Sequence, residues 1–589
     1  MNRLRRSCLP LLVALGLTAS VPVASAAAPP PPGAKKKSDK KKGAPPPPGA
    51  KEGDGDKGDA AGAEAASKSK VPAAGEASGA QDKAENEDYA NEKYDVAAAT
   101  FHGIATGKSG GDAGRAQFWL GKSLYKLGFY AAALAAFDEI VQAGSAHPYH
   151  QPTLPWLASL SRVLPEGAGV LEKIGTYKPA DLENEAFDEV RDELYYLLGR
   201  FNYRKGDLGQ AIALLSQVPD ASDFFIPAQF FLGVSEMREM RAPEAVEGFR
   251  NVLRRNIQAR DEAEARGEKR KKKLSERARK KLGISLAELE FREQNERYEE
   301  TAAIALGYIY YQLGRYDTAI TYFDRVPPAS PYWLDAVFAS AWSEFMLVQV
   351  EPDHANRHYQ RALGYVHTIN APFFYDYLYP ESLLLKAVTY YFNCRYGPAK
   401  GAIDEFNTRY LQTRKDLQGV LDAAPEDYGL YELTVQIRNE KAKLDPFVQQ
   451  VARKSIQDKT LDKHYQYVER LEYEAELLSK QTNGFKNGDV GAYVDEQLEL
   501  VTSVAKETTG GLARQRLAKA IEQIGKLRTD AIKVQYEIIN KLKALGDESL
   551  GELQKPFVDS EHEIYNYNGE YWQDELGYYN YKVTNVCPE

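Results

Sequence analysis

One pattern of apolar and small positions recurs along the chain between about residues 85 and 410. It consists of a large residue, a small residue at +3, a large residue at +7 and an apolar residue at +10. Because steps of three and four residues bring side chains to one face of a helix, each copy predicts a helix with a buried face. The small residue at +3 predicts that a second helix approaches closely there. The seven copies begin at Tyr94, Tyr130, Leu208, Ala242, Tyr316, Pro352 and Tyr396.

A second predicted helix lies upstream of most copies and ends in a glycine turn, as at Gly206 and Gly314. Helix pairs repeated at a period near 34 residues resemble the tetratricopeptide repeat family. The segment 306–319, LGYIYYQLGRYDTA, is nearly a consensus match to that family. Met240 and Cys394 depart from the family pattern, since each stands where the turn glycine is expected. The resemblance covers residues 85–410 and predicts an all-α solenoid.

The resemblance implies that the first helix of each pair lines a concave groove. An aromatic groove with a few cations suits an extended peptide or a partner helix. For each residue there is a second interpretation, in which the side chain only packs between repeats. The residues that this register places in the groove are Phe118, Lys122, Tyr125, Tyr196, Arg200, Tyr203, Phe230, Tyr308, Tyr311, Phe338, Trp342 and Phe345.

A charged insertion at residues 254–296 interrupts the array. Residues 254–281 hold 13 basic and 5 acidic residues, which gives a local net charge of +8. The insertion is either an exposed, elongated charged helix or loop, or a docking patch for an acidic partner, glycan or lipid. The densest basic run is Lys269, Arg270, Lys271, Lys272 and Lys273.

Beyond residue 410 the repeat gives way to long amphipathic helices, which we assign to a helical or coiled-coil-like region at 411–555. Apolar positions from Leu517 to Leu545 predict a helix of about 34 residues that ends at Gly546. Helices of this kind pair with each other, with the solenoid or with another chain. A helical hairpin or bundle within the chain is the favoured interpretation.

The last segment, 556–589, is rich in aromatic residues, with seven between Tyr565 and Tyr581. So many aromatic side chains either dock on the solenoid or form a partner site. Cys394 and Cys587 are the two cysteines that remain after residue 8. A disulfide between them would tie this tail to the last repeat in an oxidising compartment; the alternative is a buried free Cys394.

The first 26 residues have a basic start, an apolar stretch from Leu9 to Val23 and the small-residue ending Ala24-Ser25-Ala26. That layout predicts a secretory signal peptide, and therefore an exported protein of the periplasm or envelope. Residues 27–84 are rich in Pro, Ala, Gly and Lys and predict a disordered spacer. The spacer is either a solvated tether or a contact with an anionic envelope surface.

Composition and charge argue against several classes of function. The net charge is −9, and removal of three signal-peptide arginines takes it to −12, which argues against a nucleic-acid-binding protein. No apolar run is long enough for an integral membrane protein. Spacings such as His354/His358 lack a third metal ligand, and no acid–base pair stands out, so we expect no cofactor, no metal and no enzyme.

These features together predict an exported, non-enzymatic scaffold that binds other envelope proteins through an aromatic groove; its oligomeric state is open. A role in gliding motility or surface assembly is an analogy with exported proteins of this type. Two alternatives are an envelope tether that binds anionic wall or lipid polymers through basic segments, and a cell-wall hydrolase.

Overall fold

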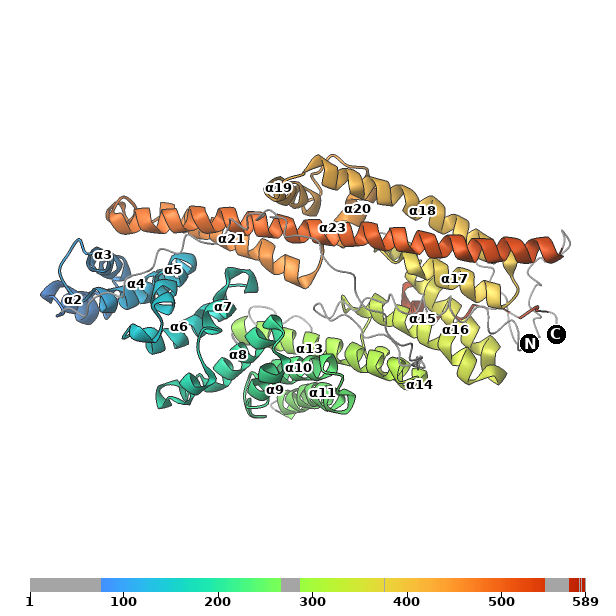
Figure 1. Cartoon of the computed structure of the whole chain (residues 1–589), viewed down its shortest axis with the longest axis horizontal. Helices are drawn as coiled ribbons and strands as arrows, with labels where there is room; N and C mark the ends of the chain where they lie inside the picture. Colours follow the sequence, from blue (N-terminus) through green and yellow to red (C-terminus); the bar gives the residue numbers. More distant parts are fainter. Residues whose placement is uncertain are drawn as a thin grey trace, which may run out of the picture.

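The computed structural model describes residues 76–265, 286–374, 377–545, 571–581, 583 and 585–587. Within these ranges the chain is helical and contains no strand. Antiparallel helix pairs follow one another from α2 to α18, and a long helix, α23, runs beside them (Figure 1). The prediction of an all-α solenoid followed by long amphipathic helices is therefore confirmed.

The first half of the array consists of short helices joined by tight turns. Gly128 and Gly206 end α4 and α8 in the left-handed conformation, which glycine adopts without steric cost. Asp112 and Asp207 cap the starts of α4 and α9 by accepting backbone hydrogen bonds. The helices are α2 (Gly79–Lys83), α3 (Tyr94–Ala105), α4 (Ala113–Leu127), α5 (Tyr130–Ala143), α6 (His150–Val163), α7 (Val170–Ile174), α8 (Arg191–Lys205) and α9 (Leu208–Leu215).

The recurring sequence pattern places the helix starts correctly. Six of the seven copies begin at the first residue of a helix, and the copy at Pro352 begins with a short 3-10 turn before its helix. The small residue at +3 is fully buried in most copies, as at Ala133 and Ala319. The preceding helix supplies a glycine at the same contact: a Cβ at Gly121 would lie 2.6 Å from the Phe137 ring, and one at Gly307 2.3 Å from Phe323. Small residues on one helix therefore receive large residues from the next.

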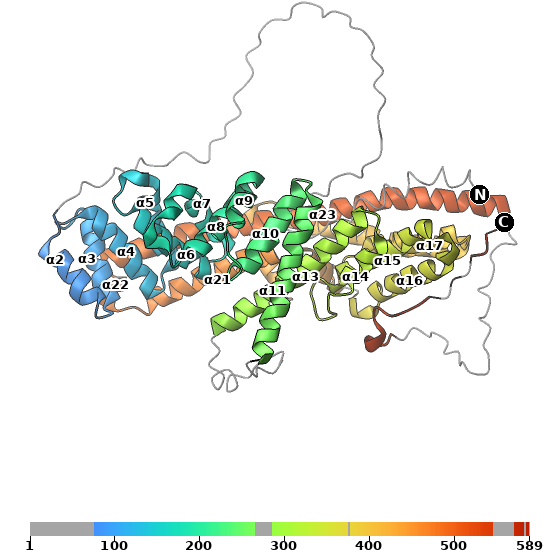
Figure 2. The same cartoon turned by 90° about the horizontal axis from the view of Figure 1, so that it is seen from below.

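The second half of the array contains longer helices. α11 and α13 extend beyond their packed neighbours and project from the body (Figure 2). The insertion predicted at 254–296 begins inside α11 and ends inside α13. Arg260 of α11 pairs with Glu299 of α13. The helices are α10 (Phe225–Arg238), α11 (Ala242–Ala265), α13 (Leu286–Gln312), α14 (Tyr316–Phe323), α15 (Trp333–Val350), α16 (Ala355–Ile369) and α17 (Pro380–Phe392).

The C-terminal helices continue the array without a break at residue 410. α18 spans Tyr396–Ala423, so the predicted boundary between 410 and 411 falls in the middle of a helix. The buried residues Tyr410 and Leu417 carry the apolar face of α18 across that point. The remaining helices are α19 (Asp427–Arg438), α20 (Pro446–Ser455), α21 (Lys459–Ser479), α22 (Asn483–Lys486) and α23 (Asp489–Leu545).

α23 is one helix of 57 residues, which at about 1.5 Å per residue extends for about 85 Å. It packs on α18, α19 and α21 along its middle, as the prediction of pairing within the chain requires, and on α3, α5 and α17 towards its ends. It is longer than the predicted helix of about 34 residues, because it continues N-terminally through Gly510-Gly511 to Asp489. The glycines permit close packing, since a Cβ at Gly510 would lie 1.8 Å from the carbonyl oxygen of Asp427.

The C-terminal helices also reach back to the first repeats. The Glu474 carboxylate of α21 accepts a hydrogen bond of 3.1 Å from the backbone N–H of Ala131, at the start of α5. The rings of Phe485 and Phe129 stack with centroids 5.8 Å apart. Lys108 and Asp489 form an ion pair of 2.6 Å although 381 residues separate them. α23 therefore connects the first and last repeats of the array.

Candidate interaction surface

Most of the residues predicted to line an open groove are buried. Seven of the twelve have at most 8% of their surface exposed, so the prediction of an open lining is wrong at those positions. The aromatic rings pack on one another and on the next helix instead; the Phe230 ring, for example, lies 5.1 Å from that of Tyr298. Aromatic side chains in contact with one another therefore fill the space between repeats. The seven residues are Phe118, Tyr196, Tyr203, Phe230, Phe338, Trp342 and Phe345.

The other five predicted groove residues, Lys122, Tyr125, Arg200, Tyr308 and Tyr311, are partly exposed. The Lys122 ammonium lies 3.3 Å from the centre of the Trp119 ring. Burial lowers the pKa of Lys122 to about 8. The Arg200 guanidinium lies 5.1 Å from the Phe231 ring centre and 5.4 Å from that of Tyr196. At these two positions a cation rests on an aromatic platform, one on α4 and the other on α8.

Tyr308 lies near two buried carboxylates, Asp335 and Glu381, that spacing in the sequence did not reveal, whereas the Tyr311 ring packs on that of Tyr316. Burial raises the pKa of both tyrosines well above the usual value. The Tyr379 hydroxyl donates a hydrogen bond of 2.6 Å to Asp335, whose pKa burial raises to about 6. Burial also raises the pKa of Glu381 to about 7. These residues come from α13, α15 and α17, so no local pattern connects them.

The described part of the C-terminal tail docks on the array. The Gly577 N–H donates to the Thr368 hydroxyl over 2.9 Å, and the Tyr581 N–H donates to the Gln360 carbonyl over 3.2 Å. The Tyr571 ring stacks on His367 with centroids 4.5 Å apart. Of the two interpretations of the aromatic tail, the structure shows the docked one for these residues. The tail crosses one face of α16 and includes a short 3-10 helix at Gln573–Glu575.

A glycine in α16 makes room for the tail. A Cβ at Gly364 would lie 1.6 Å from the carbonyl oxygen of Tyr579, so any larger residue would displace the tail backbone. Further along, the sulfur atoms of Cys394 and Cys587 are joined in a disulfide of 2.11 Å. Cys394 occupies the turn after α17 with a φ of 55°. The tail is therefore held by hydrogen bonds, ring stacking and a covalent bond.

Two parts of the sequence match the model of a known protein family. The family model described as "Tetratricopeptide repeat" matches residues 86–148 and 284–332. Both ranges contain helix pairs of the array described above. The chain is a tetratricopeptide-type repeat protein. No curated protein matches it in sequence.

A solved structure titled "Crystal structure of APC/C hetero-tetramer Cut9-Hcn1" also matches the chain. The match covers 79% of this chain and 94% of the other, at 13% sequence identity and a TM-score of 0.21. With a TM-score this low, the match supports no conclusion about arrangement or function.

Two turns of the array hold another residue where the tetratricopeptide family has glycine, and their backbone conformation is unchanged. Met240 and Cys394, at glycine positions, have φ values of 62° and 55°, in the left-handed region. Gly314, which keeps the family residue, has a φ of 73°. The same backbone turn is therefore made with and without glycine.

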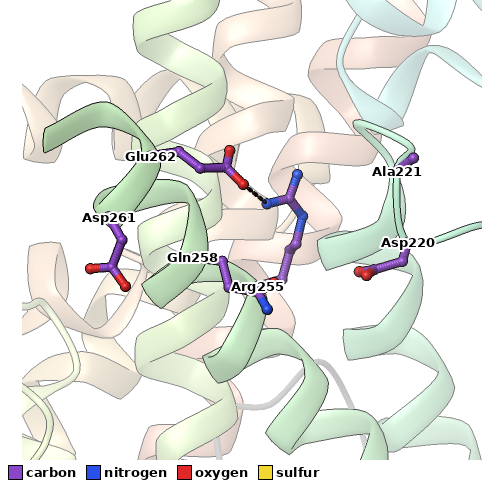
Figure 3. A pocket seen from close by; sticks show the side chains of 6 residues that line it. All are labelled: Asp220, Ala221, Arg255, Gln258, Asp261 and Glu262. Carbon is purple, nitrogen blue, oxygen red and sulfur yellow. Dashed lines mark hydrogen bonds and ion pairs between the residues drawn. The ribbon is translucent and has the colours of Figure 1, made fainter. Parts of the chain in front are cut away.

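Outside the repeats' packed faces, one shallow hollow of about 570 Å³ lies between α11 and the turn before α10 (Figure 3). Arg255 and Glu262, both on α11, approach within 3.4 Å on one side of it. Asp220 and Asp261 add two further carboxylates to its lining. This mixture of charges at an open surface does not define a ligand site.

Several predicted features concern other parts of the chain. The signal peptide, residues 27–75 of the predicted spacer and the basic run Lys269–Lys273 lie outside the described residues. The end of the predicted spacer is described and is helical, because α2 spans Gly79–Lys83. Within the described residues, no helix is long and apolar enough to cross a membrane. No cluster of three potential metal ligands occurs there either; His358 instead approaches Glu344 within 2.6 Å.

Proposed function

We propose that the protein is an exported, non-enzymatic scaffold of a bacterial envelope complex that binds segments of partner proteins on its repeat surface. Tetratricopeptide repeats suggest a scaffold for protein–protein interactions. The observation that carries the proposal is the connection of the first and last repeats by α23. Repeats held in this way present a preformed surface, which lowers the conformational entropy lost on binding.

The chemistry of the exposed positions indicates the kind of segment that binds. Lys122 and Arg200 keep part of their surface accessible while aromatic rings hold their side chains in place. A cation fixed in this way favours carboxylates and aromatic side chains of an extended peptide. The docked tail supports this proposal, because it is itself an aromatic segment bound to a helix of the array.

Two observations support export. The signal-peptide pattern of residues 1–26 is the first. The second is the Cys394–Cys587 disulfide, since such bonds persist in oxidising compartments and are rare in the cytosol. The envelope is therefore the compartment in which we place the scaffold.

The test is a crosslinking pull-down from intact cells. Wild type is compared with the double variant Lys122→Met/Arg200→Met, which keeps the apolar stems and removes both charges. We expect the partner bands to weaken at least several-fold in the variant, and the wild type to fractionate with the envelope. Lys400→Met is the matched control, because Lys400 is an exposed lysine on α18 paired only locally with Asp404. Unchanged partners in the double variant, or a cytosolic wild type, would contradict the proposal.

A further inference from the structure

One face of α16 holds the C-terminal tail. The residues of α16 that contact the tail are spaced by four, three and one positions, which places them on the same side of the helix. They are Gln360, Gly364, His367 and Thr368. α16 is the second helix of its pair with α15, whereas the groove predicted from the family resemblance is lined by first helices. The face that holds the tail is therefore a different surface from that groove.

The tail presents alternate side chains to this face. The ring centres of Tyr579 and Tyr581 lie 5.0 Å and 5.8 Å from that of His367. Val583, two residues further along, is only 2% exposed, whereas the intervening Asn580 is exposed. Alternation at a period of two is the pattern of an extended segment that is bound along one side. The face of α16 thus accepts aromatic residues at two alternate positions and an aliphatic residue at the next, which we call the alternating pattern.

The backbone of the tail also contacts the array. The Gln360 carbonyl accepts a hydrogen bond from the Tyr581 N–H, and the Gln360 side-chain amide donates to the Val583 carbonyl over 3.1 Å. The Val586 N–H donates to the Asn393 carbonyl over 3.3 Å. Because these bonds use backbone groups of the tail, they do not depend on its side chains. A segment of another protein with the alternating pattern could therefore make the same contacts.

The disulfide between Cys394 and Cys587 decides whether another segment can enter. While the bond is closed, the end of the tail cannot leave the turn after α17. Each hydrogen bond of the tail replaces one made with water, so its net contribution to docking is small. Once the bond is open, the tail is an ordinary tethered ligand with an effective concentration of about 1 mM, against which a second segment can compete.

Opening the bond is a balanced exchange with a dithiol. The dithiol gives up two electrons and two protons and becomes a disulfide, and Cys394 and Cys587 become two thiols.

From the seated tail, its alternating contacts and its covalent closure, we propose that this face of α16 is a binding site for an extended segment of a partner protein that carries the alternating pattern. The tail occupies the site while the disulfide is closed, and a dithiol reductant opens the site to the partner. This inference does not rest on the proposed function, because it concerns α16 and not Lys122 or Arg200.

Fluorescence anisotropy with a labelled synthetic peptide of residues 571–586 tests the site in the full chain. The peptide should bind Cys587→Ser/Tyr579→Ala/Tyr581→Ala, whose own tail has lost its bond and its anchoring rings. It should bind Cys587→Ser about ten-fold more weakly, because the intact tethered tail competes. It should not bind the oxidised wild type. Dithiothreitol should bring the wild type to the affinity of Cys587→Ser and leave Cys587→Ser unchanged.

Matched variants of the triple-variant chain locate the binding. Gly364→Ala should abolish binding, because a Cβ there would lie 1.6 Å from the position of the Tyr579 carbonyl oxygen. Gly401→Ala, at a helical glycine with open space around it, is the control and should keep binding, and circular dichroism should show both variants helical. Equal binding to oxidised wild type and to the triple variant would overturn the proposal. No binding to the triple variant, or unchanged binding to its Gly364→Ala form, would also overturn it.

Discussion

At the scale of single residues, a left-handed turn position is strained when it holds a residue other than glycine. Substitution by glycine removes that strain. Met240 has a φ of 62°, and a residue with a side chain pays roughly 1–2 kcal/mol for the left-handed conformation. Its side chain is 67% exposed, so little packing is lost on removal. Met240→Gly should therefore raise the free energy of unfolding by about 0.5–1 kcal/mol in urea denaturation, after the entropic cost of glycine. Gly314→Ala, the reverse change at a φ of 73°, should lower it.

The disulfide gives a second prediction at this scale. Cys394 and Cys587 should appear as one linked peptide pair in mass spectrometry without reduction. Because the bond closes a long loop, Cys587→Ser should lower the free energy of unfolding by about 2–4 kcal/mol, measured in oxidising buffer. Two free thiols in the native chain would contradict the observed bond.

At the scale of elements, the junction of α17 and α23 predicts a pH dependence. Glu381 accepts a hydrogen bond of 2.7 Å from Gln523, and burial raises the pKa of Glu381 from 4.5 to about 7. Between these pH values the folded state holds a proton that the unfolded state has lost. The free energy of unfolding should therefore fall as pH rises from about 4.5 to 7.

Glu381→Gln keeps the hydrogen-bond acceptor and removes this titration. Urea denaturation at pH 5 and pH 8 should show a smaller difference for the variant than for wild type, with the variant relatively more stable at pH 8. Asp335, whose pKa is raised to about 6, leaves a residual slope of the same sign. Glu405→Gln, at an exposed residue of α18 that pairs with Lys386, is the control and should leave this slope as in wild type. Equal slopes for wild type and Glu381→Gln would contradict the burial of Glu381.

The contact between α16 and the tail gives a further prediction. Gly364→Ala suits a helix but places a Cβ where the Tyr579 carbonyl lies, so the tail should lift from α16. Hydrogen exchange at the Gly577 and Tyr581 amides should become faster, because both donate to α16. Gly401→Ala, at a helical glycine with open space around it, is the control. Unchanged exchange in the Gly364 variant would show that the tail does not dock there.

The helices also show which features could be predicted from the sequence and which could not. Helix starts such as Tyr94 and Tyr316 could be predicted, because a periodic apolar face is a local property of the chain. The open groove could not be predicted, because periodicity locates the apolar face of a helix without saying what covers it. Phe338 and Trp342 are buried, and the Phe338 ring lies 6.0 Å from that of Tyr379, just before α17. The two buried carboxylates near Tyr308 and the length of α23 depend on contacts between distant segments, which no local pattern reports.

At the scale of the whole molecule, the array is held at both ends by the same helix. At one end Asp489 pairs with Lys108 of the first repeats, and at the other Gln523 donates to Glu381 of the last. Repeat arrays ordinarily make contacts only between neighbours, so their ends move independently. Because α23 contacts both ends of the array, the two ends cannot move independently. The proposed function rests on this restriction.

Zero-length carbodiimide crosslinking with mass spectrometry tests this closure most directly. The reagent joins an ammonium to a carboxylate only when the two are in contact, and Lys108 and Asp489 are 2.6 Å apart. We predict a crosslinked peptide between them that Asp489→Asn abolishes, alongside the local pairs Lys400–Asp404 and Lys480–Glu476. If the local pairs crosslink and Lys108 and Asp489 do not, α23 does not contact the first repeats, and the array is not closed by α23.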